Sequence, residues 1–426
     1  MPGLTRVLSD LFTIPLFTGV IGYLTNWTGV LMLFRPLAFR GVRVPGLRVL
    51  FPLLPRRVQV LPLLRYTGHL GWQGIVPSRA AKMASLAVDK GLAKLGGIGD
   101  FYRELDPDRI AEHLAATLDD QLPQVVDSIM RDEDPELWAE IPPALKEAVY
   151  ARVHEQLPSV VRELTTRIGE HAEQLIDAKL MVVNHLRQRP ELLNDIFQRL
   201  GSKELRFIQN VGFYLGVPLG LVLFAVLQAY PAAWLLPVGG ALIGWAVNHA
   251  GVTMIFEPVH PVRWVPWKQG LFLKRQHEVT DGYAALISEH VITLENIGHE
   301  LLHGPRADRT HRLLRDTLRP AVDHAVGPAR LAVRAALGPR QYERIGNTLA
   351  QRASGIAPAA IAHEGFSRRQ ARRIRDFIAR EMRRMGPDDF VQMLRSAIKQ
   401  DEWLLFVHGG VLGVAAGFAH LIILPL

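Results

Sequence analysis

Residues 22–36 read GYLTNWTGVLMLFRP, and residues 244–258 read GWAVNHAGVTMIFEP. The two stretches lie 222 residues apart (244 − 22) and are identical at seven of fifteen positions, namely Gly, Asn, Gly, Val, Met, Phe and Pro. Chance would supply about one identity at ordinary residue frequencies. Self-similarity at a fixed spacing is typical of an internal duplication, so we predict that the chain contains one unit in two copies.

A second pair of segments carries glycine at every fourth position. The later segment follows the earlier one by 197 residues (409 − 212), whereas Gly74 and Gly270, which open the preceding polar stretches, are 196 residues apart. The first copy therefore contains an insertion of 26 residues (222 − 196) between Pro36 and Gly74. Glycine stripes leave a flat helix face, which predicts close packing against another helix. The glycines concerned are Gly212, Gly216, Gly220, Gly409, Gly413 and Gly417.

Three long runs contain no Lys, Arg, Asp or Glu. They cover residues 11–34, 207–256 and 403–426, which is 24, 50 and 24 residues. A helix needs about 20 residues to cross the hydrocarbon core of a bilayer. The longest run therefore holds two spans, which separate near Pro231 because proline cannot continue a helix. We predict four transmembrane helices rather than buried helices of a soluble protein, since uncharged runs of this length are rare outside bilayers.

The polar stretches between the spans show apolar residues at three- and four-residue spacing, which is typical of helices. Runs typical of strands are scarce, so no substantial sheet is expected. The predicted fold class is an all-α membrane protein with four transmembrane helices, two long helical cytoplasmic domains and an internal tandem (parallel) duplication. We expect transmembrane helices at 1–36, 205–230, 231–258 and 402–426, a basic Pro/Arg-rich interfacial insertion at 37–73, and helical polar domains A and B at 74–204 and 259–401.

Basic residues flank the spans on one side only, with Arg6 as the exception. Arg and Lys crowd the ends of the polar stretches, whereas the connection between the second and third spans carries no charge. Because basic flanks stay in the cytoplasm, both polar domains are predicted to be cytoplasmic and both termini to lie outside. Each copy then starts and ends on the outer side, so the two copies are parallel repeats.

Composition narrows the kind of function. The chain has no cysteine, which excludes disulfides, thiolate zinc sites and thiol nucleophiles. Its formal net charge of +8 favours anionic partners, with phospholipid head groups ahead of nucleic acid. No cofactor and no catalytic constellation is predicted. The insertion at 37–73 is expected to lie along the head-group layer, and an ordinary loop packed on the domain is the open alternative.

One further segment is rich in arginine. Residues 366–384 contain eight arginines and only two acidic residues, Asp376 and Glu381. A helix this basic close to a membrane would attract anionic lipid, although a solvated helix face explains it nearly as well. The candidate lipid contacts are Arg368, Arg369, Arg372, Arg373 and Arg375.

Two asparagines fall at the same place in the two copies. Asn26 and Asn248 lie inside predicted spans, where an amide needs a hydrogen-bond partner. We favour a hydrogen bond between helices, and the alternative is that these residues, with Thr25, line a polar path.

Residues 299–303 match the H-E-x-x-H pattern of zinc peptidases. The pattern would place His299 and His303 on one helix face, with Glu300 as general base. Gly304-Pro305 follows immediately, no third ligand continues the motif, and the first copy lacks both histidines. We therefore predict no metal site and keep these two histidines as a weak candidate.

The stretch at 22–36, with Thr25-Asn26 and Met32-Leu33-Phe34-Arg35-Pro36, resembles the signature of the YheB/YjiN-type bacterial membrane proteins, catalogued as domain-of-unknown-function family 445. The chain departs from the family pattern at Gly29 and Leu31. The resemblance implies a multi-pass protein of the bacterial inner (plasma) membrane, and it carries over no activity and no catalytic residue.

The leading functional hypothesis is a non-enzymatic membrane protein whose helical domains contact anionic lipid or a protein partner, in envelope organisation or lipid handling. The alternative is a small-solute transporter or channel with a path near Asn26 and Asn248, which would need to form a homo-oligomer because four spans are few. A membrane zinc peptidase is the third hypothesis.

Overall fold

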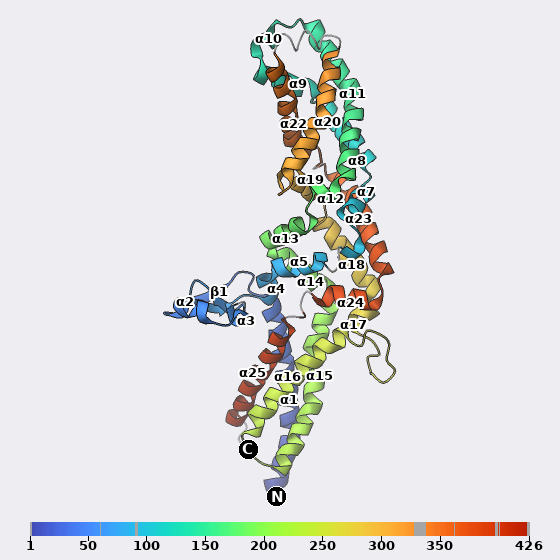
Figure 1. The fold of residues 1–426 in the computed structure, drawn as a ribbon. Coiled ribbons are helices and arrows are strands. Elements are labelled where there is room, and N and C mark those ends of the chain that lie inside the picture. Colours follow the sequence, from blue (N-terminus) through green and yellow to red (C-terminus); the bar gives the residue numbers. More distant parts are fainter. Residues whose placement is uncertain are drawn as a thin grey trace. The chain divides into compact units, whose positions relative to one another are not determined.

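Four long apolar helices lie side by side at one end of the chain's first unit (Figure 1). They are α1 (Pro2–Phe34), α15 (Ser202–Ala229), α16 (Leu235–Phe256) and α25 (Glu402–Ile423). All four are long and apolar enough to cross a membrane, with mean hydropathy between 1.3 and 2.0 in their most apolar windows. The prediction of four transmembrane helices in an all-α membrane protein is confirmed.

The computed structural model describes residues 2–59, 61–89, 93–327, 338–361, 363–396, 399 and 401–423. The last three residues of the predicted fourth span, 424–426, lie outside these ranges. The chain divides into two compact units. Unit 1 comprises residues 1–91, 183–283 and 382–426, and unit 2 comprises residues 92–182 and 284–381.

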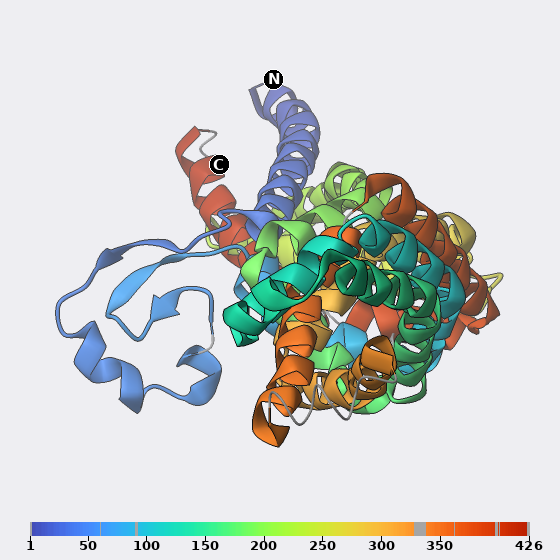
Figure 2. The same ribbon diagram turned by 90° about the horizontal axis from the view of Figure 1, so that it is seen from above.

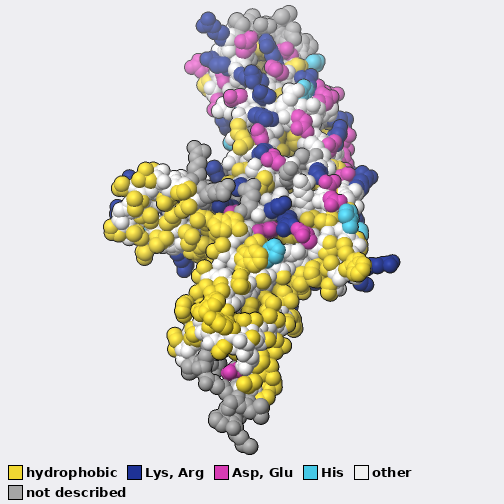
Figure 3. Space-filling view, turned by 60° about the horizontal axis from the view of Figure 1, so that its bottom comes forward, with side chains coloured by type: hydrophobic (Ala, Val, Ile, Leu, Met, Phe, Trp, Pro, Cys, Tyr) yellow, Lys and Arg dark blue, Asp and Glu magenta, His cyan; other side chains and the backbone are white. Residues whose placement is uncertain are grey.

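The outer surface of the span bundle is apolar. Phe12, Tyr214 and Ile422 are 72%, 69% and 82% exposed, although each is large and hydrophobic. Figure 3 shows hydrophobic side chains covering this bundle, while the charged side chains gather elsewhere. The N-terminal end of α1 and the C-terminal end of α25 lie at the end of the bundle where α15 connects to α16 (Figure 1). This surface needs lipid rather than water around it.

Backbone contacts between glycines hold the spans in two pairs, α1 with α15 and α16 with α25. A methyl group at Gly22 would overlap the carbonyl oxygen of Gly212, and one at Gly244 would overlap that of Gly409. Lipid tails are as apolar as leucine, so helices in a membrane associate through such close packing. The predicted packing glycines all lie at these two contacts: Gly212, Gly216 and Gly220 against α1, and Gly409, Gly413 and Gly417 against α16.

The connections that follow the C-terminal ends of α1 and α16 are closed by matching hydrogen bonds. Trp72 Nε1 donates to the Arg35 carbonyl at 3.2 Å, and Trp267 Nε1 donates to the Glu257 carbonyl at 2.8 Å. One residue after Trp72 and two residues after Trp267, a glutamine side-chain amide crosses the connection: Gln73 donates to the Leu37 carbonyl and Gln269 to the Val259 carbonyl. The same hydrogen bonds therefore close a 26-residue longer loop in the first half and a short loop in the second.

The insertion after α1 contains a small sheet, which the sequence analysis did not predict. Strands β1 (Arg40–Arg43), β3 (His69–Trp72) and β2 (Leu64–Arg65) pair antiparallel in the order β1-β3-β2. Figure 2 shows these strands and the short helices between them, in blue, gathered in one lobe. Gly41 opposes Gly71 in this register, so two of the strand positions carry glycine rather than a β-branched residue. The short helices are α2 (Leu47–Leu50), η1 (Phe51–Leu53) and α3 (Arg56–Gln59).

The remaining described elements are helices, many of which begin at a proline. Asp106 and Asp134 precede Pro107 and Pro135, and each aspartate caps the helix by accepting a backbone N–H from the first turn. In unit 1 they are α4 (Ile75–Ser78), α5 (Ala80–Ala87), α14 (Pro190–Leu200), α17 (Leu271–Lys274) and α24 (Pro387–Ser396). The unit boundaries fall within α13 (Ala178–Gln188), α18 (Gln276–His290) and α23 (Glu364–Arg384). In unit 2 they are α6 (Ala93–Leu95), α7 (Ile98–Glu104), α8 (Pro107–Asp119), α9 (Leu122–Glu133), α10 (Pro135–Glu140), α11 (Pro143–Glu170), α12 (Ala172–Leu175), α19 (Leu294–His303), α20 (Ala307–Val326) and α22 (Pro339–Ile361).

We predict that Gly22→Ala destabilises the protein by about 1–3 kcal/mol, because the added methyl forces two backbones apart. Gly29 lies on the same helix, and a methyl there meets its nearest neighbour at 3.7 Å, which is ordinary contact. Gly29→Ala is therefore the matched control and should leave stability unchanged or slightly raised. Thermal unfolding of both variants in nanodiscs measures the difference, and equal stability would contradict the packing account.

Candidate functional site

Both predicted span asparagines bind a carbonyl of the neighbouring helix. Asn26 Nδ2 donates to the Ile208 carbonyl at 2.5 Å, and Asn248 Nδ2 donates to the Leu405 carbonyl at 2.6 Å. The side chains are buried, with residue exposures of 1% and 5%. Each hydrogen bond thus joins the same two spans as the glycine contacts of its pair.

A small cavity lies among the four spans. Its volume is about 40 Å³, and its lining is mostly apolar but includes Thr25, Asn26 and His420. Asn26 Oδ1 has no hydrogen-bond partner within the described residues. A cavity of this size has room for about two or three waters. Asn248 is not among its lining residues, so the structure brings only one of the two amides to this cavity.

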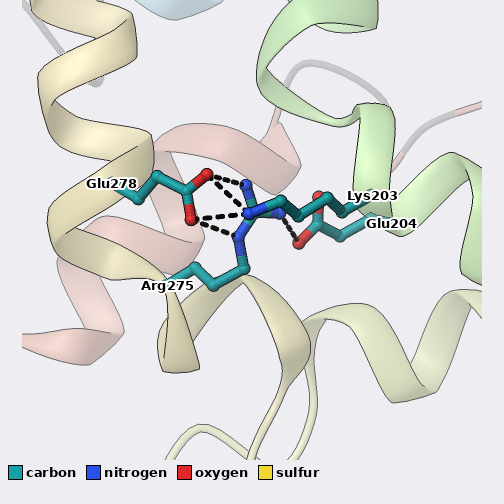
Figure 4. Close-up of polar contacts among 4 residues, drawn as sticks. All are labelled: Lys203, Glu204, Arg275 and Glu278. Atoms are coloured by element: carbon teal, nitrogen blue, oxygen red, sulfur yellow. Dashed lines mark hydrogen bonds and ion pairs between the residues drawn. The ribbon is translucent and has the colours of Figure 1, made fainter.

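Charged residues cluster at the polar end of α15 (Figure 4). Arg275 Nη1 donates to Glu204 Oε1 at 2.5 Å, and both side-chain nitrogens Nε and Nη2 of Arg275 donate to Glu278 at 2.8 Å. Lys203 Nζ also donates to Glu278, at 2.8 Å. The Glu204 side chain is only 3% exposed, so the guanidinium beside it supplies the counter-charge of a buried acidic residue.

The hydrogen bonds from Arg275 and then Lys203 lower the pKa of Glu278 to about 2. A carboxylate with a depressed pKa stabilises the folded state above its ordinary pKa near 4.5. This contribution is lost as the pH falls from about 4.5 toward 2. The cluster is therefore fully formed at neutral pH.

A second ion pair involves the residues that the repeat spacing aligns with Arg275 and Glu204. Arg79 Nη2 donates to Asp401 Oδ1 at 3.1 Å, and both side chains are largely buried. Arg79 and Arg275 are 196 residues apart, and Glu204 and Asp401 are 197 apart. Each arginine opens one polar stretch and pairs with an acidic residue at the start of the last span of the other half: Glu204 lies in the first turn of α15, and Asp401 immediately precedes α25. The sequence analysis missed these four residues, although the repeat spacing aligns them.

The arginines of α23 mostly have carboxylate partners. Arg373 lies 3.0 Å from Asp106 and Arg380 lies 3.3 Å from Glu104, so this helix is held to α7 and α8 by ion pairs. Of the five predicted lipid contacts, Arg368 pairs with Glu364, Arg375 with Asp376, and Arg369 lies over the Phe366 ring. Arg372 has no ion-pair partner within the described residues. Much of the positive charge on α23 is thus neutralised within unit 2.

The H-E-x-x-H segment forms the C-terminal half of α19. The rings of His299 and His303 stack at a tilt, with centroids 5.0 Å apart. Burial, and then the nearby Asp177 carboxylate, raise the pKa of Glu300. Within the described residues, no group of three or more His, Cys, Asp or Glu is placed to hold a metal ion. The two histidines therefore have no third ligand there.

Unit 2 contains a larger cavity, of about 210 Å³, that the sequence analysis did not predict. Aliphatic side chains from α8, α11, α19, α20 and α22 line it, and the polar side chains among the lining residues are four hydroxyls. Three of these hydroxyls donate to backbone carbonyls: Tyr102 to Thr165, Thr165 to Arg162, and Ser354 to Ala350. At about 24 cal/mol per Å³, an empty cavity of this volume would cost roughly 5 kcal/mol of stability.

A polar groove adjoins this cavity between α20 and α22. Its lining includes Asp308, His311, Arg312 and Arg315. His311 Nδ1 lies 3.4 Å from Ser354 Oγ, and Ser354 lines the cavity, so this pair marks the border between groove and cavity. The groove carries two arginines against one aspartate.

Comparison with known proteins identifies membrane proteins without an assigned activity. The chain is 39% identical over 62 residues to a UPF0754 membrane protein of Bacillus pumilus, which is 14% of this chain and 16% of the relative. It is 36% identical over 66 residues to a UPF0754 membrane protein of Bacillus cereus and 35% identical over 66 residues to one of Bacillus cytotoxicus, each 15% of this chain and 18% of the relative.

The chain thus spans less than a fifth of the length of the curated relatives it matches. No family model matches the sequence, and no solved structure matches it. These similarities and the four apolar helices support a membrane protein. The narrower assignment to the YheB/YjiN type stays a prediction.

We predict that Arg275→Met destabilises the protein by about 3–5 kcal/mol, because it leaves Glu204 buried without a counter-charge. The double variant Arg275→Met/Glu204→Gln should recover most of this loss, since no buried charge remains. Lys203→Met serves as the control: its pair with Glu278 is largely exposed, so a change of about 0–1 kcal/mol is expected. The test is the free energy of unfolding of the three variants at pH 7. A double variant as unstable as Arg275→Met would show that the unpaired charge of Glu204 is not the cause of the loss.

Proposed function

We propose that this protein is a non-enzymatic, multi-pass protein of the bacterial inner membrane that handles anionic lipid at the cytoplasmic surface. The observation that carries the proposal is the apolar and basic surface of the insertion at 37–73. Val42, Val49 and Leu53 are 70%, 75% and 79% exposed there. Exposed arginines at positions 40, 43 and 48 stand among them.

This combination is typical of a segment that lies in the interface between water and hydrocarbon. Apolar side chains enter the acyl boundary, while arginine stems extend along it and place their charges among phosphates. The insertion starts directly after α1 ends at Phe34, and the Trp72 and Gln73 hydrogen bonds fix its far end to the same place. Its position at the end of a span supports contact with the head-group layer.

We also propose that the two halves are copies of one unit, with both polar domains in the cytoplasm. The matched asparagine, tryptophan and glutamine hydrogen bonds support the duplication, and so do the reciprocal Arg79–Asp401 and Arg275–Glu204 pairs. The insertion and the arginine-rich connections lie on one side of the spans. Basic flanks place that side in the cytoplasm.

The docking of the insertion can be tested with a single label, because the chain has no cysteine. We predict that an environment-sensitive fluorophore on Leu53→Cys emits blue-shifted light in nanodiscs and is quenched by brominated lipid chains. Phosphatidylglycerol should strengthen both effects over phosphatidylcholine alone. Replacing Arg40, Arg43 and Arg48 by Gln should weaken docking by up to about 3 kcal/mol, at about 1 kcal/mol per charge.

Leu145→Cys is the matched control, because Leu145 is also exposed, at 59%, but lies on α11 in unit 2. Its fluorophore should report water in both lipid compositions. If labels at 53 and 145 behave alike, the insertion does not dock on lipid.

A second candidate function, an oligomeric small-solute channel, is favoured by the cavity among the spans, which Thr25 and Asn26 help to line and where Asn26 Oδ1 has no partner within the described residues. On this account, Asn26→Leu fills the cavity and lowers solute flux across proteoliposomes severalfold. Asn248→Leu removes an equivalent hydrogen bond, worth about 1 kcal/mol, without touching the cavity, so its flux should remain near wild type. Unchanged flux in Asn26→Leu would eliminate the channel.

A further inference from the structure

The cavity inside unit 2 is unusual for a protein interior. Native cores pack as densely as organic crystals, and voids larger than a water are few. This cavity has a volume of about 210 Å³, which exceeds the roughly 150 Å³ of an engineered cavity that stays dry and binds benzene. A helical bundle that keeps so much unfilled apolar space needs a reason for it.

We propose that this cavity binds one acyl chain of an anionic membrane lipid, whose head group lies in the adjoining groove between α20 and α22. The proposal deepens the lipid-handling function proposed above by naming the ligand and its site, and it rests on that function.

The shape of the lining fits an extended chain. Leu157, Val161, Leu164 and Ile168 form a continuous stripe along α11 within the lining. Eleven residues separate the ends of this stripe, which is about 16 Å at 1.5 Å per residue. The hydrocarbon core of a bilayer is about 30 Å thick and holds two layers of chains, so one chain accounts for about 15 Å. The cavity therefore matches the length of one membrane acyl chain.

The chemistry of the lining favours an apolar occupant. Three of its four hydroxyls already donate to backbone carbonyls, as described above. Thr310 Oγ1 is the fourth, and it is buried without a partner within the described residues. A peptide would bring unpaired amides into this space, and each would lose its hydrogen bonds to water. A hydrocarbon chain has no such groups.

The groove supplies the complementary charge. Arg312 and Arg315 are exposed on α20, and neither has an ion-pair partner within the described residues, in contrast to most arginines of α23. His311 adds a titratable donor beside Ser354, at the border of the cavity. Guanidinium groups bind phosphate oxygens well, so an anionic head group can lie here while its chain enters the cavity.

Two substitutions from different helices fill the cavity. Gly298 lines it on α19, and a methyl there would meet Ile361 at 3.5 Å, which is ordinary contact. Ala353 lines it on α22. Gly298→Leu and Ala353→Leu therefore place new methyl groups in the lumen, and Gly298→Leu also removes a helix-interior glycine, so neither is expected to unfold the protein. Gly355→Leu is the control on α22, because no atom approaches a methyl at that position within 4 Å.

The experiment uses the full chain in nanodiscs of phosphatidylcholine that contain phosphatidylglycerol with a diazirine on its acyl chain. After illumination, peptide mass spectrometry should locate lipid adducts on the lining helices α8, α11, α19, α20 and α22, as well as on the spans. Gly298→Leu and Ala353→Leu should each lower the number of adducts on the lining helices about tenfold, because each removes part of the contact with the buried acyl chain. Adducts on the spans should persist and serve as the internal standard. Gly355→Leu should resemble wild type.

The same diazirine chain on phosphatidylcholine tests the groove. Fewer lining adducts than with phosphatidylglycerol are expected, and Arg312→Gln/Arg315→Gln should remove the difference between the two lipids. Absence of lining adducts in the wild type, or equal adducts in the filled variants, would overturn the proposal. If lining adducts are absent while the label at position 53 still reports docking, the acyl-chain site is wrong and the proposed docking of the insertion stands. If lining adducts form but the label at position 53 reports water, the acyl-chain site stands and the docking of the insertion is wrong.

Discussion

Two helices gain little in hydrocarbon from burying one apolar side chain against another, because the surrounding lipid tails are equally apolar. The structure solves this with backbone contact. Gly22 meets Gly212 in one pair of spans and Gly244 meets Gly409 in the other, at separations that leave no room for a methyl group. The Asn26 and Asn248 amides then reach carbonyls of the partner helices at positions that only this closeness allows. Both joints to the polar parts of unit 1 start from helices fixed in this way.

At the polar ends of the spans, ion pairs rather than glycine contacts hold the helices together. Glu204 and Asp401 are buried acids that would be costly alone, and Arg275 and Arg79 neutralise them. Each pair links the start of one polar stretch to the polar end of a span in the other half of the chain. The glycine contacts therefore bind spans within a half, whereas the ion pairs bind the two halves to each other.

The sequence revealed the features that depend on local pattern. Runs without charge predicted the four spans, and the four-residue spacing of glycines placed Gly212 and Gly409 on contact faces, since both patterns reflect the helix period. The sheet in the insertion was missed because Gly41 and Gly71, rather than β-branched residues, face each other in its strands. The apolar cavity was missed because Ile110, Leu164 and Leu349 look like ordinary core residues, and only tertiary packing decides whether core side chains meet. Likewise, arginine content alone could not show that Asp106 and Glu104 would face Arg373 and Arg380.

The N-terminal end of α1 and the C-terminal end of α25 lie at the same end of the span bundle as the link between α15 and α16 (Figure 1). That link spans only residues 230–234 between the two helices. On the duplication proposed above, a polypeptide of half this length would begin and end at that same face. Two such polypeptides could then assemble as a dimer with the reciprocal arginine contacts already in place, and a gene fusion would need to add only a few residues to join them.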